Sequence, residues 1–267
     1  MDKPCASCSK RQAKLKDRRG KLFPALAFFL ERPCAAICRG RFLLSCSLVL
    51  GFSACAMQES NPPDTLVIGD SILAWHQFGR NSVADVIAQE TGRTVLSRAK
   101  SGARVSISSP DKVAEGFDIR AQYRPGDWDW VIINGGVNDL ISECGCRQCD
   151  GTLNKLIDHK ARSGEIFTLV SEVQRDARRV LLLGYYRSWL GATLFEGCVD
   201  VIEELNARLE LLARYSNGQV HYLSAGDVID PFERAHFYVD RIHPSRLGAR
   251  LIGEHIVAEM TRIDAGS

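Results

Sequence analysis

From residue 64 onward the sequence alternates short apolar runs with longer segments of helical periodicity, and this alternation restricts the fold more than any other feature. Apolar runs predict strands at residues 65–68, 94–97, 130–133, 180–183 and 219–223. Helical spacing predicts helices at residues 83–90, 165–177, 199–215 and 246–261. Strands separated by helix-length segments indicate an α/β fold, with a central parallel sheet of about five strands and helices on both faces.

Polar motifs follow several of these predicted strands. Gly69-Asp70-Ser71 follows the first strand, Ser101-Gly102-Ala103 the second, and Asn134-Gly-Gly-Val-Asn138-Asp139 the third. Asp240-Arg-Ile-His243-Pro244 precedes the last predicted helix. Each motif alone is typical of an ordinary turn or helix cap. In a parallel sheet, however, the carboxyl ends of the strands lie at one edge, where ligands bind.

The motifs together supply the parts of a serine hydrolase. A serine attacks an ester only when a base takes its proton, a third group orients that base, and preset donors receive the oxyanion. Ser71 is the predicted nucleophile, His243 the base and Asp240 its orienting carboxylate, provided that the residues between them form a single helical turn. The predicted oxyanion donors are the backbone N–H groups of Ser71 and Gly102 and the side-chain amide of Asn138. Glycine at position 102 is expected to leave room for the substrate oxygen.

These blocks, in this order over residues 64–262, resemble the SGNH subgroup of the GDSL-type serine esterase/lipase family. The resemblance rests on residues 69–73, Gly102, residues 136–139 and residues 240–244. It implies a three-layer flavodoxin-like sandwich, hydrolysis of acyl esters or thioesters, and no metal or other cofactor. Two positions depart from the family pattern: Ile72 stands where Leu is usual, and Ser97 stands where Asn often precedes the second block.

Residues 1–55 differ in composition from the remainder and are expected to be a leader. They hold 11 Lys and Arg against 3 Asp and Glu, whereas the rest of the chain holds 23 against 29. An uncharged run over residues 42–58 resembles a secretory signal peptide. Residues 52–55 resemble a lipobox with Phe in place of the usual Leu, which makes Cys55 the candidate for lipidation and membrane anchoring. Cleavage by an ordinary signal peptidase, an uncleaved anchor and an upstream misassigned start codon are the alternatives.

The expected organisation is therefore a leader at 1–55, a short linker at 56–63 and a hydrolase domain at 64–264. The protein is expected to be exported, either to the periplasm or as a lipoprotein of a bacterial cell envelope. An acidic body without a Lys/Arg stripe argues against nucleic acid as a partner. The expected partner is a small-molecule, glycan or lipid acyl ester, and the sequence leaves the acyl group open. The alternative is a non-catalytic module that binds carbohydrate or lipid of the envelope on the same fold.

The cysteines beyond the leader are Cys144, Cys146, Cys149 and Cys198. In an oxidising compartment they predict two disulfides, with three pairings open, whereas a four-thiolate zinc site is the alternative. Two further residues carry expectations. Trp189 follows the fourth strand and is the best placed of the tryptophans for substrate contact, although packing in the core or at the rim is the default for all of them. Asp139 is expected to orient its loop.

Overall fold

The computed structural model describes residues 62–190 and 197–266, so the leader, Cys55 and most of the predicted linker lie outside the described residues. Five parallel strands form one sheet in the order β2-β1-β3-β4-β5. They are β1 (Thr65–Ile68), β2 (Val95–Ser97), β3 (Trp128–Ile133), β4 (Ala177–Gly184) and β5 (Val220–Ser224). This is the doubly wound order of flavodoxin-like folds, and the predicted α/β class is confirmed.

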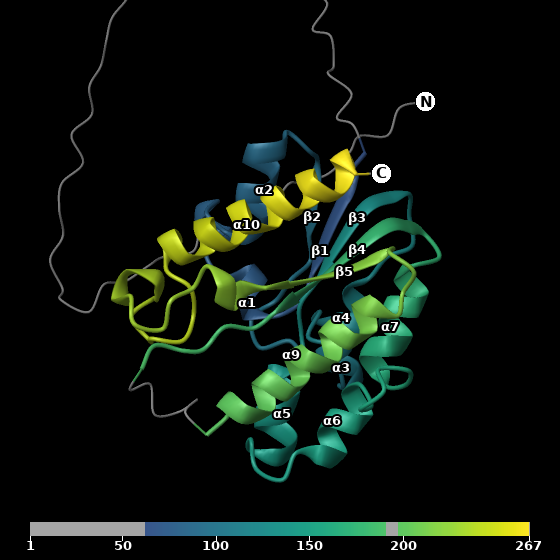
Figure 1. Ribbon diagram of the computed structural model, residues 1–267, viewed down its shortest axis with the longest axis vertical. Helices are drawn as coiled ribbons and strands as arrows, with labels where there is room; N and C mark the ends of the chain where they lie inside the picture. Colours follow the sequence, from purple (N-terminus) through teal and green to yellow (C-terminus); the bar gives the residue numbers. More distant parts are fainter. Residues whose placement is uncertain (1–61, 191–196, 267) are drawn as a thin grey trace, which may run out of the picture. The chain divides into compact units, whose positions relative to one another are not determined.

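Helices cover both faces of the sheet and complete three layers (Figure 1). On one side lie α2 (Val83–Thr91) and α10 (Arg246–Ala265), which pack against each other. On the other side lie α3 (Pro110–Ala114), α4 (Ile119–Gln122), α5 (Val137–Cys144), α6 (Asp150–Leu156), α7 (Glu165–Val173) and α9 (Val199–Arg214). Short helical turns follow β1 and β5: α1 (Ser71–Ala74) and η1 (Gln77–Gly79) come after β1, and η2 (Ala225–Asp227) and η3 (Arg234–His236) come after β5.

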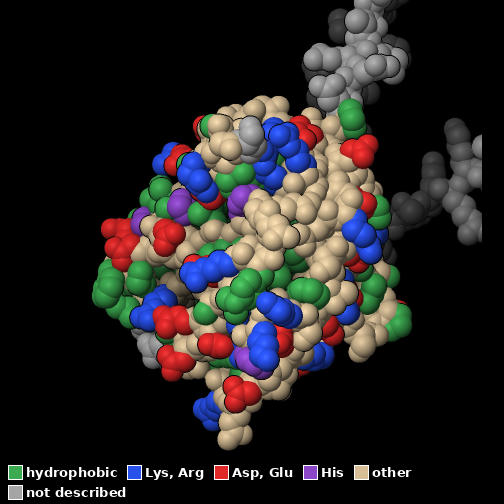
Figure 2. All heavy atoms as spheres, turned by 45° about the vertical axis from the view of Figure 1, so that its right-hand side comes forward, with side chains coloured by type: hydrophobic (Ala, Val, Ile, Leu, Met, Phe, Trp, Pro, Cys, Tyr) green, Lys and Arg blue, Asp and Glu red, His purple; other side chains and the backbone are tan. Residues whose placement is uncertain are grey.

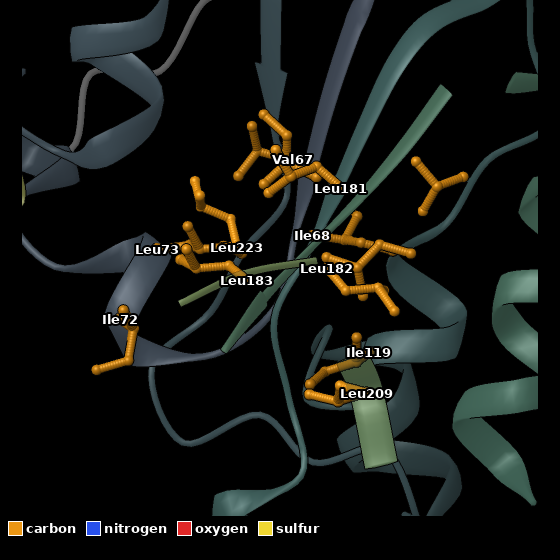
Figure 3. Packing of buried hydrophobic residues seen from close by; sticks show 14 of the residues in the cluster. Val67, Ile68, Ile72, Leu73, Ile119, Leu181, Leu182, Leu183, Leu209 and Leu223 are labelled. Atoms are coloured by element: carbon orange, nitrogen blue, oxygen red, sulfur yellow. The ribbon is translucent and has the colours of Figure 1, made fainter. Parts of the chain in front are cut away.

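The three central strands, β1, β3 and β4, are buried on both faces, which explains their nearly continuous apolar sequences. Neighbouring positions alternate between the two faces. Val67 aligns with Leu181 through Ile132, whereas Ile68 aligns with Leu182 through the next residue of β3. Figure 3 shows these two sets on opposite sides of the strands. Because both sets lie in the core, the strands are held in one register and their carboxyl ends form a fixed edge.

Two disulfides fasten the segment that follows β3. Cys144, the last residue of α5, is bonded to Cys149, and Cys146 is bonded to Cys198, the N-cap of α9. Every cysteine of the described residues is therefore cross-linked, and none offers a free thiolate to a metal.

The surface of the described domain mixes charges of both signs. On the face shown in Figure 2, Lys and Arg side chains are interspersed with Asp and Glu. Within residues 62–190 and 197–266, the helices fall short of the length and apolar character needed to cross a bilayer.

Candidate active site

The turn after β1 presents Ser71 at the edge of the sheet. Gly69 is required there, because a Cβ atom would lie 2.5 Å from the carbonyl oxygen of Asn134. The amide of the buried Gln122 holds the turn on both sides: its Oε1 accepts the Gly69 N–H at 2.7 Å, and its Nε2 donates to the Gly69 carbonyl at 3.1 Å. Asp70 caps α1 by accepting the Ile72 N–H at 3.0 Å. Ser71 is thus the first residue of a helix, where backbone N–H groups have no partner within the helix.

His243 contacts both residues that the sequence assigned to it. Its Nε2 lies 2.9 Å from Ser71 Oγ, and its Nδ1 lies 2.7 Å from Asp240 Oδ2. The segment is not the single helical turn that was expected. Asp240 Oδ1 instead accepts the backbone N–H groups of Ile242 and His243, both at 3.0 Å, and Arg241 takes a left-handed conformation with φ +67°. A turn capped by its own aspartate therefore brings carboxylate and imidazole together.

The charge of Asp240 determines which nitrogen of the His243 ring carries the hydrogen. Partial burial works to raise its pKa, but the hydrogen bond from His243 and the two backbone N–H groups outweigh burial, so the pKa of Asp240 lies below its ordinary value. An ionised carboxylate only accepts hydrogen bonds, so Nδ1 of His243 carries the hydrogen. Nε2 is then left to accept the hydroxyl proton of Ser71.

A small aromatic cluster lies beside the imidazole of His243 and consists of Trp75, His76 and Tyr238. The Trp75 ring stacks on it, with the two planes 2° apart and the ring centroids 3.8 Å apart. The adjacent His76 Nε2 donates to the carbonyl of Pro244 at 3.1 Å. Tyr238 packs edge-on against Trp75, and its backbone N–H donates to the carbonyl of His243 at 2.8 Å. The segment that carries the serine is thereby joined directly to the segment that carries the histidine.

The predicted oxyanion residues lie on the same cavity as Ser71 and His243. Asn138 is in the first turn of α5, and its Nδ2 donates to the carbonyl of Ala103 at 2.9 Å. An amide nitrogen carries two hydrogens, so one remains for another acceptor. Gly102 adopts φ +79°, and a Cβ atom there would meet only the Phe117 ring at 3.8 Å. Its backbone conformation, in addition to the space expected for a substrate, therefore favours glycine.

Asp139 connects α5 to the loop that follows β2. Its buried carboxylate accepts the N–H groups of Val105 at 3.0 Å and Ser106 at 2.7 Å. Burial raises the pKa of Asp139 to about 6, and the two backbone hydrogen bonds offset part of that effect. This contact orders the loop after β2 that carries Gly102, whereas the sequence predicted that Asp139 orients its own loop after the third strand.

A second buried carboxylate lies directly beside the serine, and the sequence did not point to its partner. Tyr185, which follows β4, donates its hydroxyl to Asp70. Burial raises the pKa of Asp70 despite this bond, and burial together with the negative charge of Asp70 raises the pKa of Tyr185. The two side chains brace the turn after β1 against the end of β4.

The sequence made Trp189 the best placed of the tryptophans for substrate contact, with packing as the default. Trp189 does not line the cavity; its ring packs instead against the guanidinium groups of Arg241 at 4.6 Å and Arg234 at 5.9 Å. Trp75 is the tryptophan that lines the cavity. Among the residues that the structure describes, no cluster of three or more His, Cys, Asp or Glu side chains is arranged to hold a metal ion.

Comparisons with known proteins identify a family and similar folds. Residues 67–251 match the GDSL-like lipase/acylhydrolase family. Similar folds include an inhibitor-bound aryl esterase of M. smegmatis (20% identity, TM-score 0.54, covering 76% of this chain and 100% of that one). Another is a carbohydrate acetylesterase of Sinorhizobium meliloti (19% identity, TM-score 0.53, covering 76% and 100%). A search of the curated proteins finds no significant match.

Proposed function

The chain belongs to the GDSL-like lipase/acylhydrolase family, and from that premise we propose that it is an exported serine esterase that cleaves carboxylic acyl esters. The observation that carries the proposal is the chain of hydrogen bonds from Asp240 through His243 to Ser71, with distances of 2.7 and 2.9 Å. Nucleophile and base are within the reach that covalent catalysis requires, and a third group orients the base.

In the proposed reaction, Ser71 Oγ attacks the ester carbonyl carbon while His243 Nε2 takes the hydroxyl proton. The oxyanion accepts hydrogen bonds from the backbone N–H groups of Ser71 and Gly102 and from the amide of Asn138. As the intermediate collapses, His243 returns the proton to the departing alcohol. Water then attacks the acyl-enzyme with the same histidine as base and releases the acid. Asp240 stays ionised throughout and stabilises the imidazolium.

Export to a bacterial cell envelope is the second part of the proposal. It is supported by the signal-like run over residues 42–58 and by the lipobox-like Cys55, which would anchor the domain to a membrane. Two disulfides are typical of a protein that folds in an oxidising compartment. Globomycin treatment of cells that express the full chain provides the test, because it blocks processing at Cys55 only if the precursor is a lipoprotein.

Ser71→Ala is the test of the chemistry. We expect it to lower the hydrolysis of p-nitrophenyl acetate by on the order of a thousandfold or more, with an unchanged melting temperature, because Ser71 Oγ acts chemically and is only partly buried. A fluorophosphonate probe should label the native protein and leave the variant unlabelled. If the folded variant kept its activity, Ser71 would not be the nucleophile. Absence of turnover and labelling in the native protein would favour the non-catalytic binding module.

A further inference from the structure

The cavity beside Ser71 is much larger than the reacting groups need. Its volume is about 650 Å³, within the range of ~300–1,000 Å³ that is typical of sites for drug-sized ligands. From Ser71 and His243 it extends past the ends of β4 and β5 to the first turns of α9. An acetyl group on a small alcohol would leave most of it unoccupied.

The floor of this cavity is apolar. Ile72, Val137 and Ile229 line it and are buried, and so are the rings of Tyr185 and Tyr186. Both tyrosine hydroxyls are already engaged, since Tyr185 donates to Asp70 and Tyr186 donates to the carbonyl of Ile242 at 2.9 Å. The rings therefore present carbon surfaces to an occupant.

The first turns of α9 add an apolar wall to this floor. Val199 and Ile202 line the cavity from that helix, and both are partly exposed to it and to solvent. They stand at the N-terminal end of α9, next to the disulfide of Cys198. The wall is therefore held in place covalently.

Three of the polar side chains that line the cavity are held by contacts within the protein. Arg187 pairs with Glu203 through Nε at 2.9 Å, and the amide of Asn206 bonds the backbone N–H and carbonyl of Tyr185, both at 2.9 Å. A sugar ring placed against the apolar floor would lose hydrogen bonds to water without replacing them, because both tyrosine hydroxyls there are engaged, whereas an apolar group gains from burial.

We propose that this cavity binds an apolar substituent of the ester that is larger than acetyl, such as an alkyl chain of about four or more carbons. The inference rests on the proposed function and narrows its substrate class. The apolar substituent can belong to the acyl group or to the alcohol of the ester, so the experiment has one arm for each.

In the first arm, p-nitrophenyl acetate, butyrate, hexanoate and octanoate vary the acyl chain. In the second, ethyl, butyl and hexyl acetate vary the alcohol, with acid release followed by titration. Each buried methylene should raise kcat/KM about three- to fourfold until the cavity is filled. We expect one arm to rise by on the order of tenfold or more between its shortest and its six-carbon member. A preference for the shortest ester in both arms would overturn the proposal while leaving the esterase function intact.

Ile202→Trp places an indole in the cavity and should lower the ratio of six-carbon to two-carbon kcat/KM about tenfold or more in the arm that rises. Ala207→Trp is the matched control, because Ala207 is exposed on the same helix and does not line the cavity. We expect it to leave that ratio unchanged. An equal loss in both variants, or an unchanged ratio in Ile202→Trp, would contradict the assignment of this wall.

A binding measurement makes the inference independent of turnover. Octanoate and octanol are titrated calorimetrically into Ser71→Ala protein, and we expect at least one to bind with a stoichiometry of one. Ile202→Trp in the same background should weaken that binding about tenfold or more. If neither compound binds, the cavity does not serve an alkyl chain, whatever the outcome for ester hydrolysis.

Discussion

His243 is restrained from three directions. Asp240 holds Nδ1, Ser71 lies against Nε2, and the indole of Trp75 covers one face of the ring. The two hydrogen bonds lie in the plane of the imidazole and leave its tilt free. The flat contact with Trp75 removes that freedom. A base held in this way loses little orientation when it takes up the serine proton.

Trp75 is accordingly expected to act as a positioning residue. Trp75→Leu removes the flat aromatic contact and the attraction of the ring face for an imidazolium, which is worth about 0.5–2 kcal/mol. We expect kcat to fall about tenfold while KM for p-nitrophenyl acetate changes less than threefold. Trp75→Phe keeps an aromatic face and should recover most of the loss. If Phe and Leu were equally impaired, stacking would not be the reason for the effect.

Asn138 has one amide hydrogen committed to Ala103 and one remaining for the proposed oxyanion. Asn138→Ala removes a donor that acts on charge formed only in the transition state, so kcat should fall about a hundredfold or more with little change in KM. Steady-state kinetics on p-nitrophenyl acetate provide the measurement. An unaltered kcat would assign the third donor to another group.

Parts of the site that depend on short sequence motifs could be predicted from the sequence. Parts that depend on contacts between distant segments could not. The order of the polar motifs at successive strand ends is local information, and it singled out Ser71, Asn138 and His243. The stacking of Trp75 on His243 depends on a contact between segments 168 residues apart in the sequence, which no local pattern records. Gln122 was missed for the same reason: its amide holds Gly69 from 53 residues away.

The strands were easier to predict than the short helices. A continuous apolar run such as residues 130–133 belongs to a strand buried on both faces, and β3 extends it only to Trp128. No helix was predicted over α5, because the motif at residues 134–139 is typical of a turn or helix cap. In the structure Gly136, with φ +115°, is its N-cap, and the helix is stabilised by the burial of Leu140 and by the hydrogen bonds of Asp139. Tertiary contacts therefore override a weak local preference.

Asp139, which joins α5 to the loop after β2, should make the stability of the protein depend on pH. Because the folded-state pKa of Asp139 (about 6) exceeds its ordinary value of about 3.9, the folded protein holds a proton that the unfolded chain releases between those two values. The stability that the folded protein gains by holding this proton on Asp139 is full at about pH 4 or below and is lost as pH rises through 6. Its size is on the order of 3 kcal/mol.

Asp139→Asn removes the titration. We expect the free energy of unfolding of the native protein, measured relative to that of the variant, to fall between pH 4.5 and pH 7. Urea denaturation at the two pH values measures it, and the comparison cancels the other titrating groups. A difference between the two proteins that stays constant with pH would show that Asp139 titrates in its ordinary range.

At the scale of the whole domain, the two disulfides should contribute unequally to the free energy of unfolding. Cys146 and Cys198 are 52 residues apart, whereas Cys144 and Cys149 are 5 apart. Loop-closure entropy gives about 4 kcal/mol for the long loop and about 2 kcal/mol for the short one. Cys146→Ala/Cys198→Ala should therefore lower the melting temperature more than Cys144→Ala/Cys149→Ala. Non-reducing peptide mapping of the native protein first establishes the pairing, and any other pairing would overturn this ranking.

The contact between the segment that carries Ser71 and the segment that carries His243 also determines when, during synthesis, the site can form. The serine and the histidine are 172 residues apart, and translation at ~5–20 residues per second separates their appearance by roughly ten to thirty seconds. A nascent chain, or a product truncated before residue 240, carries the serine without its base. The proposed hydrolysis therefore requires synthesis to have passed His243, and the serine becomes reactive only after that point.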